Sequence, residues 1–216
     1  DIMPGQTEME EQEEEHRESV SYFARWTDRY KEAREYLYGT MEAEPDEEAA
    51  HEIMLEEAEQ GNAYAMHDMG KIYAQGIGCE ADKEMADVWY KKALAAMQYV
   101  EQKKKNTYLE YRIGKMYQYG LGTDEKLEQA GEWFSKAAAK EHKYALYSLG
   151  MLYLQGKGVE QDEETAYSLL FRSYSKGNPY AAYELGKLYE TGCGTEKNQE
   201  KSENCYRVAF LGFLNL

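Results

Sequence analysis

The chain has 216 residues, a net charge of −16 and a pI of about 4.8. This acidity argues against broad contact with nucleic acid or an anionic membrane surface, because both require a basic footprint. No apolar run approaches the roughly 18 residues of a membrane span, and no signal peptide is visible. Three cysteines without a C-x-x-C pair predict free thiols in a reducing compartment, so we expect a cytoplasmic protein.

The N-terminal part divides into two segments. Residues 1–18 contain eight acidic side chains and no apolar periodicity, which predicts a flexible acidic segment. Residues 19–62 contain a degenerate repeat, because the YLYG stretch that starts at Tyr36 matches the YAQG stretch that starts at Tyr73, 37 residues later. We expect helices over 19–39 and 46–60 here, the second one ending at Gly61.

From residue 63 onward one pattern of about fifteen residues recurs four times. Its copies are Tyr64–Gly78, Tyr108–Gly122, Tyr144–Gly158 and Tyr180–Gly194, with central glycines Gly70, Gly114, Gly150 and Gly186. Such a period predicts an all-α solenoid built from helical pairs. We place the repeats at 63–106, 107–142, 143–178 and 179–216, with a second helix over 83–102 in the first that is about two turns longer.

Positions counted from the central glycine define two faces of the first helix in each pair. Apolar or small residues at −5, −1, 0 and +3 share one face, which predicts a buried side. A glycine at the centre of a helix costs about 0.5–1 kcal/mol relative to alanine, so its recurrence predicts a close approach of the second helix. The G-x-G that follows supplies residues able to take positive φ in a tight turn.

These residues carry a family resemblance. The frame A-x-x-x-L-G-x-x-Y-x-x-G-x-G-V…D…A-x-x-W-[YF]-x-K-A-A resembles Sel1-like repeats, which are relatives of tetratricopeptide repeats. It matches closely at Tyr144–Gly158, Val159, Asp162, Ala166, Ala130, Trp133, Phe134, Lys136, Ala137 and Ala138. The match is close over 63–216 and weak over 19–62, while Leu169 and Cys205 replace the family's tryptophan. The resemblance implies a right-handed α/α superhelix that serves as a non-enzymatic scaffold for protein interactions.

A second resemblance gives an alternative function. The order of EAREYLYG, a Pro-Asp loop, four Sel1-like units and a lysine-rich insert is similar to the tails of relaxase-type mobilisation proteins from Gram-positive bacterial mobile elements. This resemblance implies an accessory C-terminal domain of a larger protein. It implies no nickase activity, because the histidine cluster of a relaxase is absent from the sequence.

The outward face of each first helix is rich in tyrosine and basic residues. We predict that it binds a partner, and in tetratricopeptide-like solenoids the equivalent face lines the concave groove. The predicted residues are Tyr64, Tyr108, Tyr144 and Tyr180 at −6; Tyr30, His67, Tyr111, Tyr147 and Tyr183 at −3; Arg34, Lys71, Lys115, Met151 and Lys187 at +1; and Tyr119 at +5.

Rigid aromatic area beside lysines suits a protein or peptide with carboxylates and apolar anchors. The alternative is that the tyrosines stack between repeats and only stiffen the solenoid. We expect no catalytic residues, metal site or cofactor, because no two of the four histidines have ligand spacing and the G-x-G motifs end helices.

Overall fold

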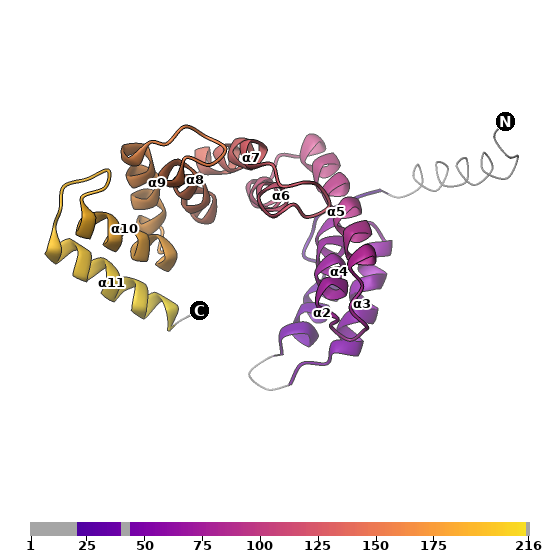
Figure 1. The fold of residues 1–216 in the computed structure, drawn as a ribbon. Helices are drawn as coiled ribbons and strands as arrows, with labels where there is room; N and C mark the ends of the chain where they lie inside the picture. Colours follow the sequence, from indigo (N-terminus) through magenta and orange to yellow (C-terminus); the bar gives the residue numbers. More distant parts are fainter. Residues whose placement is uncertain (1–20, 40–43, 215–216) are drawn as a thin grey trace, which may run out of the picture. The chain divides into compact units, whose positions relative to one another are not determined.

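The computed structural model describes residues 21–39 and 44–214, so the acidic segment expected at 1–18 lies outside the described residues. Over these ranges the chain forms ten α-helices and no strand (Figure 1), and the predicted all-α repeat solenoid is confirmed. The chain divides into two compact units, Asp1–Lys104 (unit 1) and Lys105–Leu216 (unit 2).

Unit 1 contains four helices that pack in chain order, α2 on α3, α3 on α4 and α4 on α5. Their bounds are Asp28–Tyr38 for α2, Glu47–Glu59 for α3, Ala63–Gln75 for α4 and Lys83–Lys103 for α5. The extended second helix predicted for the first full repeat is confirmed as α5. Gly61 ends α3 as predicted, with φ at 98° and its N–H bonded to the carbonyl of Ala58.

The predicted start of the first helix at residue 19 is wrong, because α2 begins only at Asp28. Thr27 caps this helix, its side chain accepting a hydrogen bond from the N–H of Tyr30. Phe23 forms an isolated bridge with Asn62, and its N–H and carbonyl bond to Gly61 and Ala63. The backbone of this segment therefore pairs with the α3–α4 junction and is not available for a helix.

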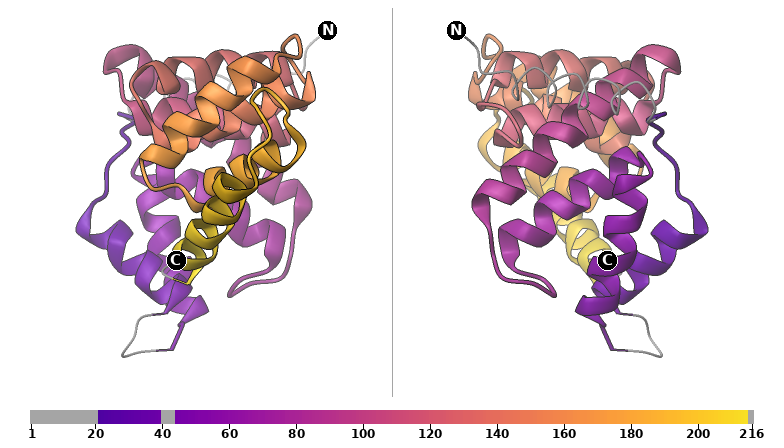
Figure 2. Two further views of the ribbon diagram at one scale, coloured as in Figure 1. Left: turned by 90° about the vertical axis from the view of Figure 1, so that its left-hand side faces the viewer. Right: turned by 90° about the vertical axis from the view of Figure 1, so that its right-hand side faces the viewer.

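Unit 2 contains three helical pairs, α6–α7, α8–α9 and α10–α11, in which neighbouring helices lie side by side (Figures 1 and 2). The bounds are Thr107–Tyr119 for α6, Leu127–Ala139 for α7, Lys143–Gln155 for α8, Glu163–Ser175 for α9, Pro179–Thr191 for α10 and Gln199–Phe213 for α11. Between pairs, α7 packs on α8 and α9 packs on α10. Each repeat therefore buries one face within its pair and another against its neighbour.

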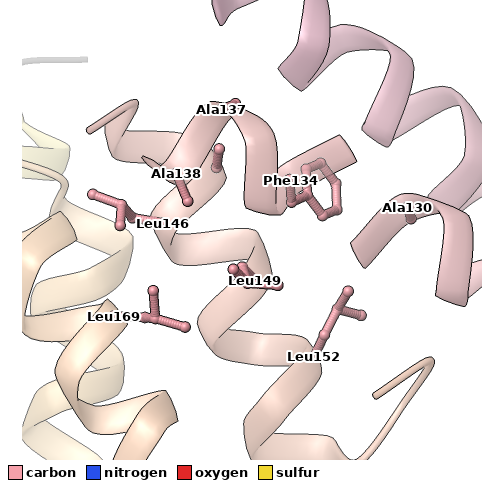
Figure 3. Packing of buried hydrophobic residues seen from close by; sticks show 9 residues of the cluster. Ala130, Phe134, Ala137, Ala138, Leu146, Leu149, Leu152 and Leu169 are labelled. Carbon is pink, nitrogen blue, oxygen red and sulfur yellow. The ribbon is translucent and has the colours of Figure 1, made fainter. Parts of the chain in front are cut away.

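The core of unit 2 shows this packing directly. Phe134 from α7, Leu146 and Leu149 from α8, and Leu169 from α9 belong to one buried cluster (Figure 3). The cluster continues from one helical pair into the next, as expected for repeats that cannot bury their apolar faces alone.

The predicted close approach at the central glycines is confirmed. A Cβ at Gly114 would lie 2.6 Å from the ring of Phe134, and a Cβ at Gly150 would lie 3.0 Å from Leu170. Gly70 and Gly186 face the rings of Tyr90 and Tyr206 in the same way. In every repeat the contact residue lies twenty positions after the glycine, on the second helix of the same pair.

Candidate functional site

In unit 1 the predicted outward face of α2 and α4 is partly covered by the chain itself. Tyr30 and Tyr64 are 0% and 2% exposed, so the expectation that they face away from the core is wrong. The ring of Trp26 lies 5.2 Å from that of Tyr30 and 6.4 Å from that of Tyr64. The irregular segment before α2 therefore brings in an aromatic ring that the helical periodicity could not place.

A buried carboxylate organises this region of unit 1. Asp68 accepts a hydrogen bond of 2.7 Å from the hydroxyl of Tyr30 and one of 3.1 Å from the guanidinium of Arg34. His67 Nδ1 lies 3.2 Å from the other carboxylate oxygen. The Asp68 side chain is only 4% exposed, so an ionic partner is needed to offset its loss of hydration. Our sequence reasoning missed Asp68, although it is the only acidic residue of α4.

The basic residues predicted in unit 1 contact its own aromatic side chains. The Arg34 guanidinium lies 5.2 Å from the ring centroid of Trp26 and 4.9 Å from that of Tyr38. Lys71 donates a hydrogen bond of 2.9 Å to the Tyr38 hydroxyl. Solvent reaches part of Arg34, His67 and Lys71, which are half-buried. This face is therefore accessible at its basic residues, whereas Tyr30 and Tyr64 are covered.

In unit 2 the tyrosines form a row along the first helices α6, α8 and α10. The rings of Tyr111 and Tyr144 lie 6.1 Å apart, as do the rings of Tyr147 and Tyr180. Each of these contacts joins one repeat to the next. We call the five residues Tyr111, Tyr144, Tyr147, Tyr180 and Tyr183 the tyrosine row. The stacking considered as an alternative thus occurs in the structure.

Stacking does not bury the whole row. Within the row, Tyr180 and Tyr183 are 46% and 47% exposed. Outside the row, Tyr119 at the end of α6 is 59% exposed. Tyr108, Tyr111, Tyr144, Tyr147 and Met151 are half-buried. The row therefore has packed members that hold the repeats together and exposed members that present ring area to solvent.

His142, which our sequence reasoning did not assign to this surface, lies between the rings at the start of α8. Its ring centroid is 4.8 Å from that of Tyr111 and 6.3 Å from that of Tyr108. Its Nδ1 accepts a hydrogen bond from the N–H of Ala145 and so caps the helix. Burial and the neighbouring Lys143 lower the pKa of His142, while burial raises the pKa of Tyr111 to about 12.

The charged residues of the unit 2 surface pair within their own helices. Lys115 donates a hydrogen bond of 2.9 Å to the Tyr119 hydroxyl, and Lys187 donates one of 2.8 Å to the Glu184 carboxylate. Burial and the nearby Glu184 carboxylate raise the pKa of Tyr147. Glu184, also missed from the sequence, is 8% exposed and lies two residues before the central glycine, as Asp68 does in α4.

Other kinds of site are not found over the described ranges. No group of three or more His, Cys, Asp or Glu side chains in residues 21–39 and 44–214 is placed to hold a metal ion. None of the helices in these ranges has the length and apolarity needed to cross a membrane. Burial raises the pKa of the Cys193 thiol to about 11, so its reactive thiolate form is scarce at neutral pH.

These helical pairs with central glycines and G-x-G turns define an α/α repeat solenoid. The family model described as Sel1 repeat matches residues 30–62, 63–96, 108–142, 143–178 and 179–210, and the chain belongs to this family. Proteins with Sel1 repeats are generally non-enzymatic scaffolds for protein interactions. The resemblance to relaxase tails remains a prediction.

The chain is also similar to solved bacterial structures. A Sel1 repeat protein from Oxalobacter formigenes is 25% identical over 85% of this chain and 69% of that one, with a TM-score of 0.66. A protective antigen from uropathogenic Escherichia coli with an SLR fold is 27% identical over 85% of this chain, with a TM-score of 0.57. This chain spans only 37% of that antigen's length.

An immunity protein from Pseudomonas aeruginosa is 19% identical over 91% of this chain and 86% of that one, with a TM-score of 0.52. This likeness shows the shared fold alone. No curated protein matches the chain.

Proposed function

We propose that this protein is a non-enzymatic scaffold that binds a protein or peptide through the tyrosine-rich faces of its first helices. The observation that carries the proposal is the exposure of Tyr180 and Tyr183 beside packed members of the same row. Because neighbouring rings already restrain the row, little side-chain entropy is lost when a partner covers it. In unit 1 the side chains of Arg34, His67 and Lys71 are half-buried at the surface, and the proposal includes them as binding residues.

The ligand chemistry follows from the side chains of unit 2. Tyrosine rings provide apolar area with a polar tip, and they suit aliphatic or aromatic anchors of a peptide. Lys115 and Lys187 bear positive charge beside the rings and suit carboxylates. We therefore propose a peptide or protein partner with apolar and acidic anchors, without direct binding to nucleic acid or membrane.

We also infer that the chain acts in the cytoplasm without catalysis of its own. The three thiols are unpaired in the structure, which favours a reducing compartment. Burial raises the pKa of the stacked residue Tyr111 to about 12 and also raises the pKa of Tyr147, which supports a packing and recognition role over acid–base chemistry.

Selection of peptides from a displayed random library on the full chain tests the proposal. The selected peptides should lose at least about tenfold in affinity for Tyr180→Ala/Tyr183→Ala, because aromatic anchors dominate such interfaces. The matched control is Phe171→Ala, which removes a 44% exposed ring from the second helix α9 and should leave affinity unchanged. Equal affinity for both variants, or the absence of any selected peptide, would count against the proposal.

A further inference from the structure

The junction between the first helices α2 and α4 shows how this protein holds a cationic side chain. Arg34 of one repeat donates to the buried Asp68 of the next, while the hydroxyl of Tyr30 donates to the same oxygen. The rings of Tyr30 and Tyr64 lie 6.3 Å apart beside this pair. The Arg34 guanidinium lies 4.9, 5.2 and 5.9 Å from the ring centroids of Tyr38, Trp26 and Tyr30. It thus has a carboxylate for its hydrogen bond and aromatic rings for its flat face, the two contacts that arginine favours.

The junction between α8 and α10 in unit 2 repeats part of this arrangement, with Lys143 and Gln155 at the positions of Trp26 and Tyr38. Counted from the central residue of each repeat, Tyr147 corresponds to Tyr30, Tyr180 to Tyr64, Tyr183 to His67 and Glu184 to Asp68. The ring distance is also reproduced, at 6.1 Å for Tyr147 and Tyr180 against 6.3 Å for Tyr30 and Tyr64. The buried carboxylate and the tyrosine pair are therefore present in both junctions.

The arginine itself is replaced in unit 2. The position of Arg34 is occupied by Met151, a half-buried neutral side chain packed against the edge of the core cluster. Within the described residues, Lys187 of the same helix donates a hydrogen bond to Oε2 of Glu184. Lys187 is 49% exposed, and such exposed i,i+3 pairs are weak. Glu184 is nearly buried and lacks the cross-repeat cation that Asp68 has.

We infer that Tyr147, Tyr180, Tyr183 and Glu184 form a binding site for an arginine side chain supplied by the partner. The guanidinium would take the place that Arg34 occupies in unit 1, donating to Glu184 Oε1 and lying against the tyrosine rings. The inference rests on the proposed function, because the site lies on the tyrosine row. It adds a basic anchor to the apolar and acidic anchors proposed above.

A small probe tests this site directly. We expect N-acetyl-arginine N-methylamide to bind the full chain with saturable shifts of NMR signals in α8 and α10 and a Kd on the order of 1 mM. The neutral isostere N-acetyl-citrulline N-methylamide should bind at least about tenfold more weakly, because it lacks the charge that Glu184 recognises. Equal binding of both probes, or no saturable binding of the arginine probe, would overturn the inference.

Two variants locate the probe. Met151→Arg should fill the site from within the chain, as Arg34 does in unit 1, and abolish probe binding, whereas the volume-conserving Met151→Leu should retain it. Glu184→Gln should weaken probe binding by at least about tenfold. Because this second variant keeps Met151, it tests the site even if Met151→Arg does not fold. Undiminished binding to Glu184→Gln, or to folded Met151→Arg, would show that the probe binds elsewhere.

The peptides selected above separate the two proposals. Peptides that depend on Tyr180 and Tyr183 but contain no arginine, together with failure of the probe, would overturn the arginine site and leave the scaffold function standing. A probe that binds and depends on Glu184, without any selected peptide, would support the site and count against the broader proposal.

Discussion

At the scale of single residues, the central glycines show close packing between the two helices of each pair. Gly114 sits against the ring of Phe134, which is fully buried, so neither the backbone nor the ring has room to move. Gly150 faces Leu170, and a Cβ at Gly150 would lie farther from its neighbour than a Cβ at Gly114 would. Two copies of one motif therefore differ in the residue that fills the contact.

This difference gives a prediction for alanine substitutions. Gly114→Ala should destabilise the protein by about 1–3 kcal/mol, because its Cβ would lie 2.6 Å from the Phe134 ring. Gly150→Ala should be much milder, since a 3.0 Å approach needs only a small shift and alanine favours a helix by about 0.5–1 kcal/mol. Urea denaturation of both variants measures the difference. A reversed order would show that packing at the glycine does not control stability.

At the scale of helices and turns, the second glycine of three G-x-G motifs packs against the previous repeat of the same unit. Gly158 has φ at 70°, and a Cβ there would overlap the backbone of Leu127 in the first turn of α7. Gly78 and Gly194 meet the first residues of α3 and α9 in the same way. The first glycine of the motif, such as Gly156, only ends its helix in the left-handed conformation.

The two glycines of one turn should therefore respond differently to substitution. Gly158→Ala should cost at least about 2 kcal/mol more than Gly156→Ala, because both strain a positive φ but only the first collides with a neighbouring backbone. Gly156→Ala, whose Cβ would lie 3.0 Å from that of Gln161, is the matched control in urea denaturation. Similar costs would mean that the repeats do not depend on this contact.

The start of α8 gives a prediction about pH. Burial lowers the pKa of His142 in the folded state, and its neutral Nδ1 caps the helix by accepting from Ala145. The unfolded chain therefore binds more protons between the folded pKa and the ordinary value near 6.5, and stability falls as pH drops below about 6.5.

Replacement of the cap isolates this contribution. His142→Asn keeps a capping acceptor and does not titrate, so the variant should lose less stability than the wild type between about pH 7 and about pH 5. Urea denaturation at both pH values measures the difference, and the remaining histidines cancel in the comparison. An equal loss of stability in the variant and the wild type would exclude His142 as the source of the pH dependence.

At the scale of the whole molecule, charge is distributed unequally between the two units. Unit 1 holds 26 acidic and 11 basic residues, for a net charge of −15, whereas unit 2 holds 15 acidic and 14 basic residues, for a net charge of −1. The acidity of the chain is therefore a property of unit 1. Self-repulsion of like charges destabilises a compact state, and salt screens it.

Separate fragments should differ in their response to salt. We expect both 1–104 and 105–216 to unfold cooperatively, because each unit has its own packed core. The melting temperature of 1–104 should rise by several degrees between about 0.05 M and about 0.5 M NaCl, while that of 105–216 should change little. Calorimetry measures both, and an equal response would show that net charge does not limit the stability of unit 1.

The helices and their internal packing were predictable because the residues that specify them lie within a single repeat. The glycines, caps and apolar spacing of a helical pair lie within about forty residues of sequence, and four copies repeat the same signal. The bounds of α4 and the approach of Phe134 to Gly114 follow from that local pattern. The start of α2 did not follow, because Phe23 pairs with residues about forty positions away.

The candidate site was predictable only in part. Periodicity placed the tyrosines on a common face of their helices, and in unit 2 that face keeps exposed members. It could not show that Trp26 buries Tyr30 and Tyr64, or that Arg34 reaches Asp68 of the next repeat. The sequence by itself determined the repeated helical pair. Only the tertiary structure determined which side chains remain accessible, because burial and ion pairing depend on neighbours that helical spacing does not specify.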